Sequence, residues 1–352
     1  MKASFISTAT FLKTPRSNVS RIQADLDKAV AESSKGRYAD VGLELGYRTG
    51  LSLNLRQEVD NLDAQSRRNG LTGVRLDSSY HALDRVRTDG EAFLALTTPG
   101  KLTDTSGTVV AQMAATKLTA LIGDLNTSTG GQYLFGGINT GQRPIADYEA
   151  SPQSAAKTAF QQAFTNEFHF PPGTQPDTSN ITPAQMEHFL QDGGRFAQLF
   201  EDNQWKQNWS SASDVNIKSD ITRNETVESS VNANAQPLRQ LAMMYTLASD
   251  IGLASLGPAT QNVVYDKLRS LANAGTLGVK DIQADIGVVQ ARIGTVGKQI
   301  DAQKNIMTEG FGKLEAVDWE EVATRTQNLE AQLKVAYSLT GQVSKLSLLD
   351  YI

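Results

Sequence analysis

Three histidines are the residues of this chain whose type most often carries catalytic or metal-binding chemistry. His81, His169 and His188 are far apart in the sequence, so none has a second histidine at helical spacing. Glu187 is adjacent to His188, but neighbouring residues on a helix point in different directions and cannot share a ligand. The pattern predicts packed or solvated histidines and no catalytic or metal site.

The segment Gly294-Thr-Val-Gly297-Lys298 is the nearest approach to a phosphate-binding loop. Such a loop has four residues between its glycines, a Ser or Thr after the lysine and a strand before it. Here two residues separate the glycines, Gln299 follows the lysine, and both glycines fall within an apolar heptad repeat. Small residues in a coiled coil allow close helix approach, so the segment predicts helix packing and no nucleotide binding.

The segment Asp318-Trp-Glu-Glu321 groups acidic residues around a tryptophan. Paired carboxylates transfer protons where a fold brings them together. The same residues also suit the start of a helix, with Asp318 as the N-cap and Glu321 at the third position, because acidic groups complement the helix dipole there. We interpret the segment as a helix N-terminus.

The amino-acid composition excludes several further kinds of site and partner. The 352 residues include no cysteine, which excludes disulfides, thiolate metal sites and a cysteine nucleophile. A net charge of -5, with no basic stripe, argues against a nucleic-acid partner. We therefore predict no enzyme activity, no cofactor and no metal.

The sequence also lacks predicted membrane and leader segments. Its first residues, MKASFISTATFLKTPRS, contain no apolar run of the kind found in a secretory signal. No run of about 18 apolar residues occurs elsewhere. We expect no cleaved signal peptide and no membrane insertion.

Proline positions divide the chain into three parts. Eight of the ten prolines lie between Pro144 and Pro258, and none lies between Pro15 and Pro99 or after Pro258. Because proline breaks helix interiors, this distribution predicts long helices toward both ends and an irregular centre.

Apolar residues toward the C-terminus repeat every three and four positions, as in a coiled-coil seam. A weaker run follows from Trp319 to Val343, and Gly310-Phe-Gly312 between the two runs predicts a helix break. The first run forms one side of a predicted rod seam: Ile282, Ile286, Val289, Ile293, Val296 and Ile300.

The N-terminal part mirrors this arrangement. A first helix with helical apolar spacing is interrupted at residues 33–36. A second, from about residue 50 to 96, would be roughly 70 Å long at 1.5 Å per residue, and a third is expected from about 106 to 125. The second helix supplies the other side of the rod seam: Leu55, Val59, Leu62, Leu76 and Leu83.

The centre has different signals. Tyr133-Leu-Phe-Gly-Gly137 is a short apolar run with a glycine stop, and Thr182 followed by Pro183 predicts a helix start. Alternation over residues 215–218 predicts a strand. We expect residues 141–238 to form a separate, small mixed α/β insert domain.

Together these elements predict a mainly α fold, a long antiparallel coiled-coil rod formed by the N- and C-terminal segments with the insert in the middle. A lone helix with an apolar seam is unstable in water, so the two ends must pair. The predicted parts are terminal helices (1–40 and 310–352), a rod (41–140 and 239–309) and the insert (141–238).

The terminal helices have Thr, Ser and Ala at seam positions, so we expect them to be disordered in the monomer and ordered on assembly. A charged substitution at Leu333 or Leu346 should then stop assembly without unfolding the rod. The predicted interface of these helices comprises Val19, Ile22, Leu26, Leu329, Leu333, Val343 and Leu346.

Short segments at both ends resemble the bacterial flagellin family. At the N-terminal end these are Ile6-Ser-Thr8 and the sequence ESSKGRYAD that ends at Asp40; the family's usual double aspartate is reduced here to that one residue. At the C-terminal end they are Leu329-Glu-Ala-Gln-Leu333 and the ending LSLLDYI. Tyr133-Leu-Phe-Gly-Gly-Ile-Asn139 is similar to a segment of the family's hook-associated members.

The resemblance implies a structural subunit of the bacterial flagellum that joins the hook side to the filament and supports flagellin polymerisation. It implies a ring or tubular homo-oligomer with the terminal helices at its core. The implied partners are a neighbouring hook-associated protein, flagellin and a cytoplasmic export chaperone. The implied location is extracellular, reached unfolded through flagellar type III export. Two alternatives stay open: a flagellin that forms the filament itself, and a coiled-coil scaffold protein of another class.

Overall fold

The computed structural model describes residues 8–97 and 107–349, and the side chains of residues 16–97 and 107–342. The described chain is mostly helical, with long antiparallel helices and a small strand region in the middle, which confirms the predicted fold class. It forms two compact units. The terminal unit comprises Met1–Ala64 and Gln299–Ile352, and the central unit comprises Gln65–Lys298.

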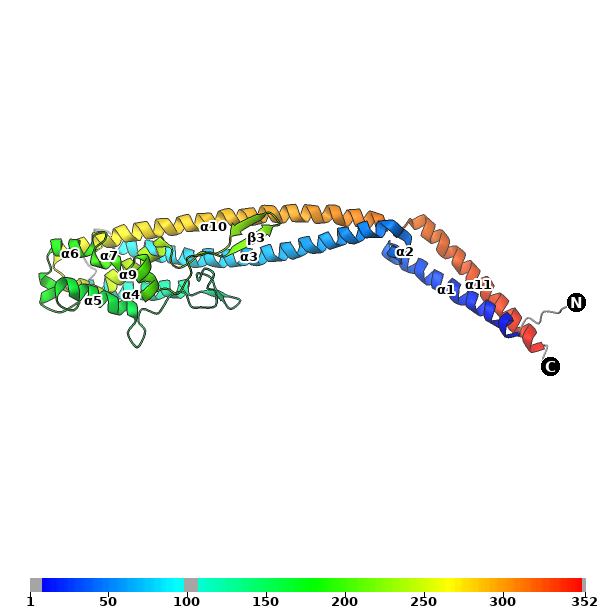
Figure 1. Cartoon of the computed structure of the whole chain (residues 1–352), viewed down its shortest axis with the longest axis horizontal. Coiled ribbons are helices and arrows are strands. Elements are labelled where there is room, and N and C mark those ends of the chain that lie inside the picture. The colour runs from blue at the N-terminus through cyan, green and yellow to red at the C-terminus, as the bar shows by residue number, and fades with distance from the viewer. Residues whose placement is uncertain (1–7, 98–106, 350–352) are drawn as a thin grey trace. The chain divides into compact units, whose positions relative to one another are not determined.

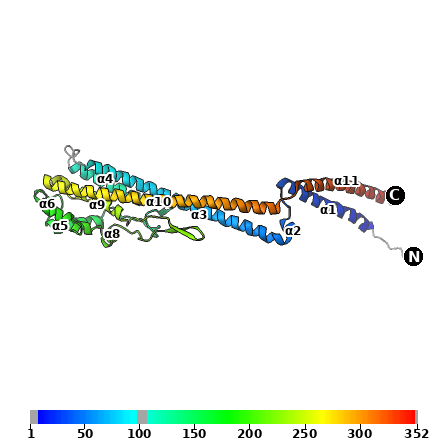
Figure 2. The ribbon, with the colours of Figure 1, turned by 90° about the horizontal axis from the view of Figure 1, so that it is seen from above.

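In the terminal unit, α1 (Thr8–Lys35) lies beside α11 (Trp319–Leu349), as Figure 1 and Figure 2 both show. The helix α1 ends where Gly36 adopts a φ of 67°, a left-handed conformation that favours glycine. The helix α11 begins at the predicted cap, because Asp318 Oδ1 accepts the backbone N–H of Glu320 at 2.8 Å.

Two short elements connect α1 to the first long helix. They are α2 (Val41–Leu45) and the 3₁₀ turn η1 (Gly46–Arg48), and they lead directly into α3 (Thr49–Leu96). Asp40 caps α2, because its Oδ1 accepts the backbone N–H of Leu43 at 3.0 Å. The bounds of α3 confirm the helix expected over residues 50–96.

The expected break at Gly310-Phe-Gly312 is wrong, since α10 (Pro258–Glu315) continues through it and the break lies at residues 316–318. A glycine costs about 1 kcal/mol in a helix interior, which is not enough by itself to end a long helix. The position of a Gly310 side chain would be 3.5 Å from Leu55 Cδ1. The Phe311 ring carries the Arg56 guanidinium at 4.5 Å from its centroid.

Within the central unit, α3 and α10 run antiparallel. Gln290 Nε2 donates to Asp77 Oδ1 at 2.5 Å, and Arg269 Nη1 donates to the Thr97 carbonyl at 2.7 Å. Residue numbers therefore rise along α3 as they fall along α10. Inside the terminal unit, Lys304 pairs with Asp63 at 2.5 Å, which gives the same antiparallel sense.

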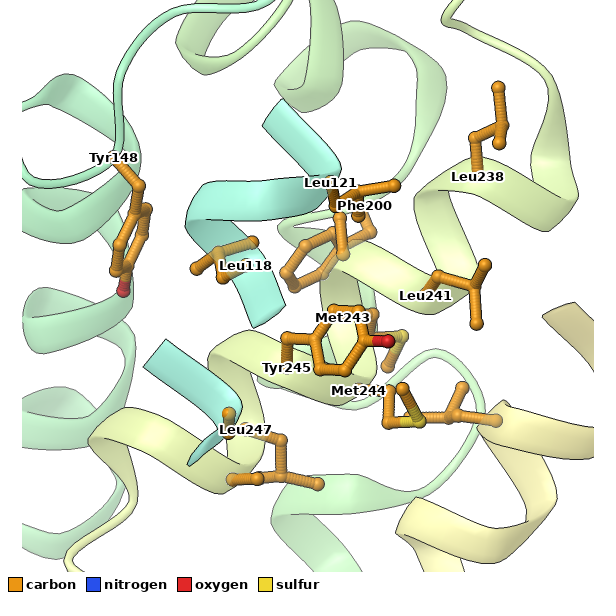
Figure 3. Close-up of a cluster of buried hydrophobic side chains, with 14 of the residues drawn as sticks. Leu118, Leu121, Tyr148, Phe200, Leu238, Leu241, Met243, Met244, Tyr245 and Leu247 are labelled. Atoms are coloured by element: carbon orange, nitrogen blue, oxygen red, sulfur yellow. The ribbon is translucent and has the colours of Figure 1, made fainter. Parts of the chain in front are cut away.

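The core of the central unit is built by α4 (Gly107–Leu125) and α9 (Gln236–Asp250) against α3 and α10. The segment of α9 from residue 241 to 248 is buried all round, as expected of a central core helix. Figure 3 shows Leu118 and Leu121 of α4 together with Met243, Met244 and Tyr245 of α9.

Residues 141–238, the expected insert domain, fall within the central unit. Their buried side chains, Tyr148 and Phe200 among them, belong to the same hydrophobic cluster as α4 and α9 (Figure 3). Stacked aromatic rings contribute to this packing. The ring centroids of Trp205 and Trp209 are 5.2 Å apart, and those of Trp209 and Tyr148 are 5.1 Å apart. The insert is therefore continuous with the central core.

The other elements of the central unit are short. The strand expected over residues 215–218 is instead β3 (Lys218–Thr222), paired antiparallel with β4 (Glu225–Glu228). Thr182 caps its helix with the predicted capping box. The remaining elements are β1 (Ser128–Thr129), β2 (Gln132–Tyr133), α5 (Ala155–Phe168), η2 (Asp177–Asn180), α6 (Pro183–Leu190), α7 (Arg195–Gln198), α8 (Asp202–Asn208) and η3 (Leu253–Ser255).

A search of the helices for one long and apolar enough to cross a membrane found none among the described residues.

Candidate assembly surface

The pair of helices α1 and α11 has a seam that is only partly covered. Val19, Ile22 and Leu26 on α1 are half-buried, as are Leu329 and Leu333 on α11. Two helices shield one stripe of each other and leave the flanks of that stripe open to solvent. The structure thus brings these five predicted residues to one helix pair, while the side chains of Val343 and Leu346 lie outside the part of the chain that it describes.

The predicted rod seam is also unevenly covered. Among its residues, Leu76, Leu83, Ile286, Val296 and Ile300 are buried. The others are half-buried: Leu55, Val59, Leu62, Ile282, Val289 and Ile293. The heptad pattern placed both sets on one face. Leu76, Leu83 and Ile286 belong to the hydrophobic cluster that α4 and α9 complete, whereas Val296 and Ile300 are buried outside that cluster.

The terminal unit exposes more large apolar side chains than it buries. Its buried apolar residues, among those described, are Ala29, Ile300, Val317 and Val322. Exposed apolar side chains are surface that a neighbouring molecule can cover. The exposed large apolar residues of this unit are Val30, Leu43, Tyr47, Leu51, Leu53, Ile306, Trp319, Val335, Tyr337 and Leu339.

The two chain segments of the terminal unit break their helices at the same level and are tied together there. The Tyr38 N–H donates to the Glu315 carbonyl at 3.0 Å, and the Val317 N–H donates to the Gly36 carbonyl at 3.3 Å. These bonds satisfy backbone groups that the ends of α1 and α10 leave open. We call residues 36–40 with 315–318 the clasp.

Two buried carboxylates reinforce the clasp. Glu315 accepts hydrogen bonds from Ser52 Oγ at 2.5 Å and from Arg56 Nε at 3.0 Å. Glu32 accepts the N–H of Ala39 at 3.0 Å and pairs with Arg325 of α11. Both carboxylates are nearly inaccessible to solvent, so each depends on its partners for the solvation it has lost.

The electrostatics of Glu315 give the clasp a pH dependence. The hydrogen bond from the Arg56 guanidinium, with help from Ser52 and the charge of Arg37, lowers the pKa of the Glu315 carboxyl from its ordinary 4.5. A lowered folded-state pKa contributes stability that is present above the unfolded-state value and is lost as pH falls through the folded value. The clasp should therefore weaken below pH 4.5.

We expect Glu315→Gln to remove this pH dependence. Amide exchange at Tyr38 and Val317 reports opening of the clasp, and comparison of the two proteins at each pH cancels the intrinsic exchange rate. The wild type should be better protected above pH 4.5, and the difference should shrink in more acid solution. A difference that stays constant with pH would contradict the assignment.

The histidines and the Gly294–Lys298 segment do not come together in one site. His188 Nδ1 lies 2.6 Å from Glu167 Oε1 on the surface, whereas His169 ends α5 with a φ of 68°. Gly294 and Lys298 lie inside α10, where no loop is available to cradle a phosphate. Among the described residues, no group of three or more His, Asp or Glu side chains is placed to hold a metal ion.

Sequence reasoning missed the clasp carboxylates. Glu32 and Arg325 are separated by 293 positions, and neither stands in a local pattern that distinguishes it from other surface charges. Glu32 does lie at the start of the ESSKGRYAD segment, which is the only sequence signal near the site.

Comparisons with known proteins agree with this geometry. The model of the bacterial flagellin N-terminal helical region matches residues 6–140, and that of the C-terminal helical region matches residues 271–352. A solved structure from Vibrio parahaemolyticus, described as a flagellar hook-associated protein, is similar with a TM-score of 0.50 and 12% identity, covering 76% of this chain and 97% of that one. At that identity the likeness shows the fold alone. A search of curated proteins found no match.

Proposed function

Because this chain belongs to the bacterial flagellin family and is a structural protein of the flagellum, we propose that it is the subunit that joins the hook side to the filament. In this role its terminal helices pack with those of neighbouring copies in a ring or tubular layer. The layer contacts a hook-associated protein on one side, and flagellin polymerises on the other.

The observation that carries this proposal is the imbalance of apolar surface in the terminal unit. Ten large apolar side chains are exposed there, against four buried apolar residues among those described. Such a unit has apolar surface left to bury against neighbours, at about 25 cal/mol per Å² removed from water. We also infer that the α1–α11 pair is ordered fully only on assembly, which leaves α11 available to an export chaperone beforehand.

The choice of the junction over the filament rests on the Tyr133–Asn139 segment and the C-terminal ending. In the structure, Leu134 and Phe135 are fully buried, and Arg75 Nη2 donates to the Tyr133 carbonyl at 2.8 Å. A side chain at Gly137 would lie 2.5 Å from the Ser213 carbonyl oxygen. Arg75 thus ties the segment to α3, and Gly137 leaves room for the close approach of the backbone at Ser213.

Deletion of the gene tests the proposal. We expect electron microscopy to show bare hooks and a blot of the culture medium to show flagellin shed as monomers, because the filament has no base on which to grow. A plasmid copy of the intact gene should restore filaments, and a copy lacking the last helix, α11, should not.

The other outcomes separate the alternatives. Bare hooks without shed flagellin, or shortened filaments, would make this chain a filament subunit. Normal flagella would overturn both flagellar roles and favour the coiled-coil scaffold. Detection of the chain in the medium of the wild type, and its loss in an export-defective strain, would support export through the flagellar type III apparatus.

A further inference from the structure

The segment formed by α2 and η1 contributes no side chain to the buried core. Neither element has a buried residue among its eight positions, 41–48. Leu43 is 73% exposed and Tyr47 is 89% exposed. A helix this short is marginal by itself in water, and here it displays apolar side chains to solvent. Both features indicate an interaction surface for another molecule.

A cavity of about 380 Å³ lies beside this segment. Its apolar lining includes Val41 and Leu53, and its cationic lining consists of Lys35, Arg37 and Arg56. The carboxylate in the lining, Glu315, accepts hydrogen bonds from Ser52 and Arg56 and lies 3.9 Å from Nη1 of Arg37. The cavity therefore offers an apolar interior with a positive edge.

The start of α11 has the complementary character. Trp319 is 59% exposed and is flanked by two exposed carboxylates, Glu320 and Glu321. Asp318 uses its Oδ1 to cap the helix. In the part of the chain that the structure describes, neither Glu320 nor Glu321 has a cationic partner.

We propose that Trp319 of one copy inserts into the cavity beside α2 of a second copy, with Glu320 and Glu321 facing Lys35 and Arg37. This inference rests on the proposed self-assembly and names its contact. We infer that the contact is heterologous, so that each copy gives its projection to one neighbour and its cavity to another; such a contact repeats from copy to copy and generates a ring or a helical tube. Tryptophan buried at the centre of an interface commonly carries a large part of its binding energy.

Cross-linking of cysteine variants tests the contact, because the chain has no cysteine of its own. Leu53→Cys marks the cavity and Glu320→Cys marks the projection, and neither replaces Trp319. The two proteins, purified at full length, are mixed at a concentration where the wild type pellets as polymer and are treated with a short bis-maleimide. We expect linked dimers in the mixture, none in either protein alone, and a ladder of higher species from the double variant.

Leu277→Cys, on α10 of the central unit and also exposed, should not link to Leu53→Cys. A wild type that never pellets would overturn the proposed self-assembly itself. A wild type that pellets while the mixture stays unlinked, or links no more than each variant alone, would overturn the Trp319 contact and leave self-assembly standing.

Fluorescence provides a second readout. Trp205 and Trp209 are buried in the central unit, so quenching by acrylamide in the monomer reports mainly Trp319. Polymer formation should remove this quenching. Trp319→Ala should raise the protein concentration needed for polymer at least about tenfold, whereas Tyr337→Ala, an exposed aromatic on the same helix, should change it less. Undiminished quenching of Trp319 in the polymer would contradict the contact.

Discussion

Leu333→Glu should abolish polymer formation while the central unit stays folded. Leu333 lies half-buried on α11 at the seam with α1, and a carboxylate there is unfavourable wherever neighbouring copies close over the seam. The central unit holds nearly all of the buried apolar side chains, so its thermal transition should shift by less than about 2 °C. Pelleting and a circular-dichroism melt of the same sample measure the two effects.

A matched control is available one turn further along α11. Ser338 is exposed, so Ser338→Glu adds the same charge away from the seam and should leave polymer intact. Normal polymer from Leu333→Glu would show that the seam is not an assembly contact. Collapse of the main thermal transition would show instead that the α1–α11 pair is part of the folded monomer's principal core.

Leu83→Ala should destabilise the central unit by about 3 kcal/mol. Leu83 on α3 is 0% exposed and belongs to the cluster shared with α4 and α9, so truncation leaves a cavity that neighbouring layers cannot readily fill. Urea unfolding followed by circular dichroism gives the free energy of unfolding.

The comparison is Leu71→Ala on the same helix. Leu71 is 73% exposed, and its truncation should change the free energy of unfolding by no more than about 0.5 kcal/mol. Equal losses for both variants would mean that helix propensity, and not burial, decides the stability of α3.

The long helices could be predicted because their signals are local. The spacing of Leu76 and Leu83, and that of Ile286 and Ile300, repeats along single helices, and proline-free stretches delimit those helices. Periodicity identifies the face but not the depth of burial. Ile286 is buried and Ile293 is half-buried, although both stand on the same repeat, because the layers that cover them come from elsewhere in the chain.

Features that depend on distant residues could not be predicted. The stacking of Trp209 on Tyr148 and the pairing of Glu32 with Arg325 join segments that carry no shared local pattern. The same applies to the continuous core: the prolines correctly marked residues 141–238 as irregular, but irregular backbone does not reveal whether its aromatic side chains pack among themselves or on α4 and α9. At Gly310-Phe-Gly312, the local glycines favoured a break, but α10 continues through them to Glu315.

The pairing of α1 with α11 joins segments from the two ends of the chain. Gln23 meets Tyr337 across 314 positions of sequence, so the contact closes a loop that includes nearly the entire polypeptide. Local helices form in microseconds, whereas a contact of such separation waits for the whole intervening chain. A chain cut short anywhere before α11 leaves the seam of α1 without its partner. If neighbouring copies contact the paired helices as proposed, a truncated product would lack the surface that a growing assembly needs.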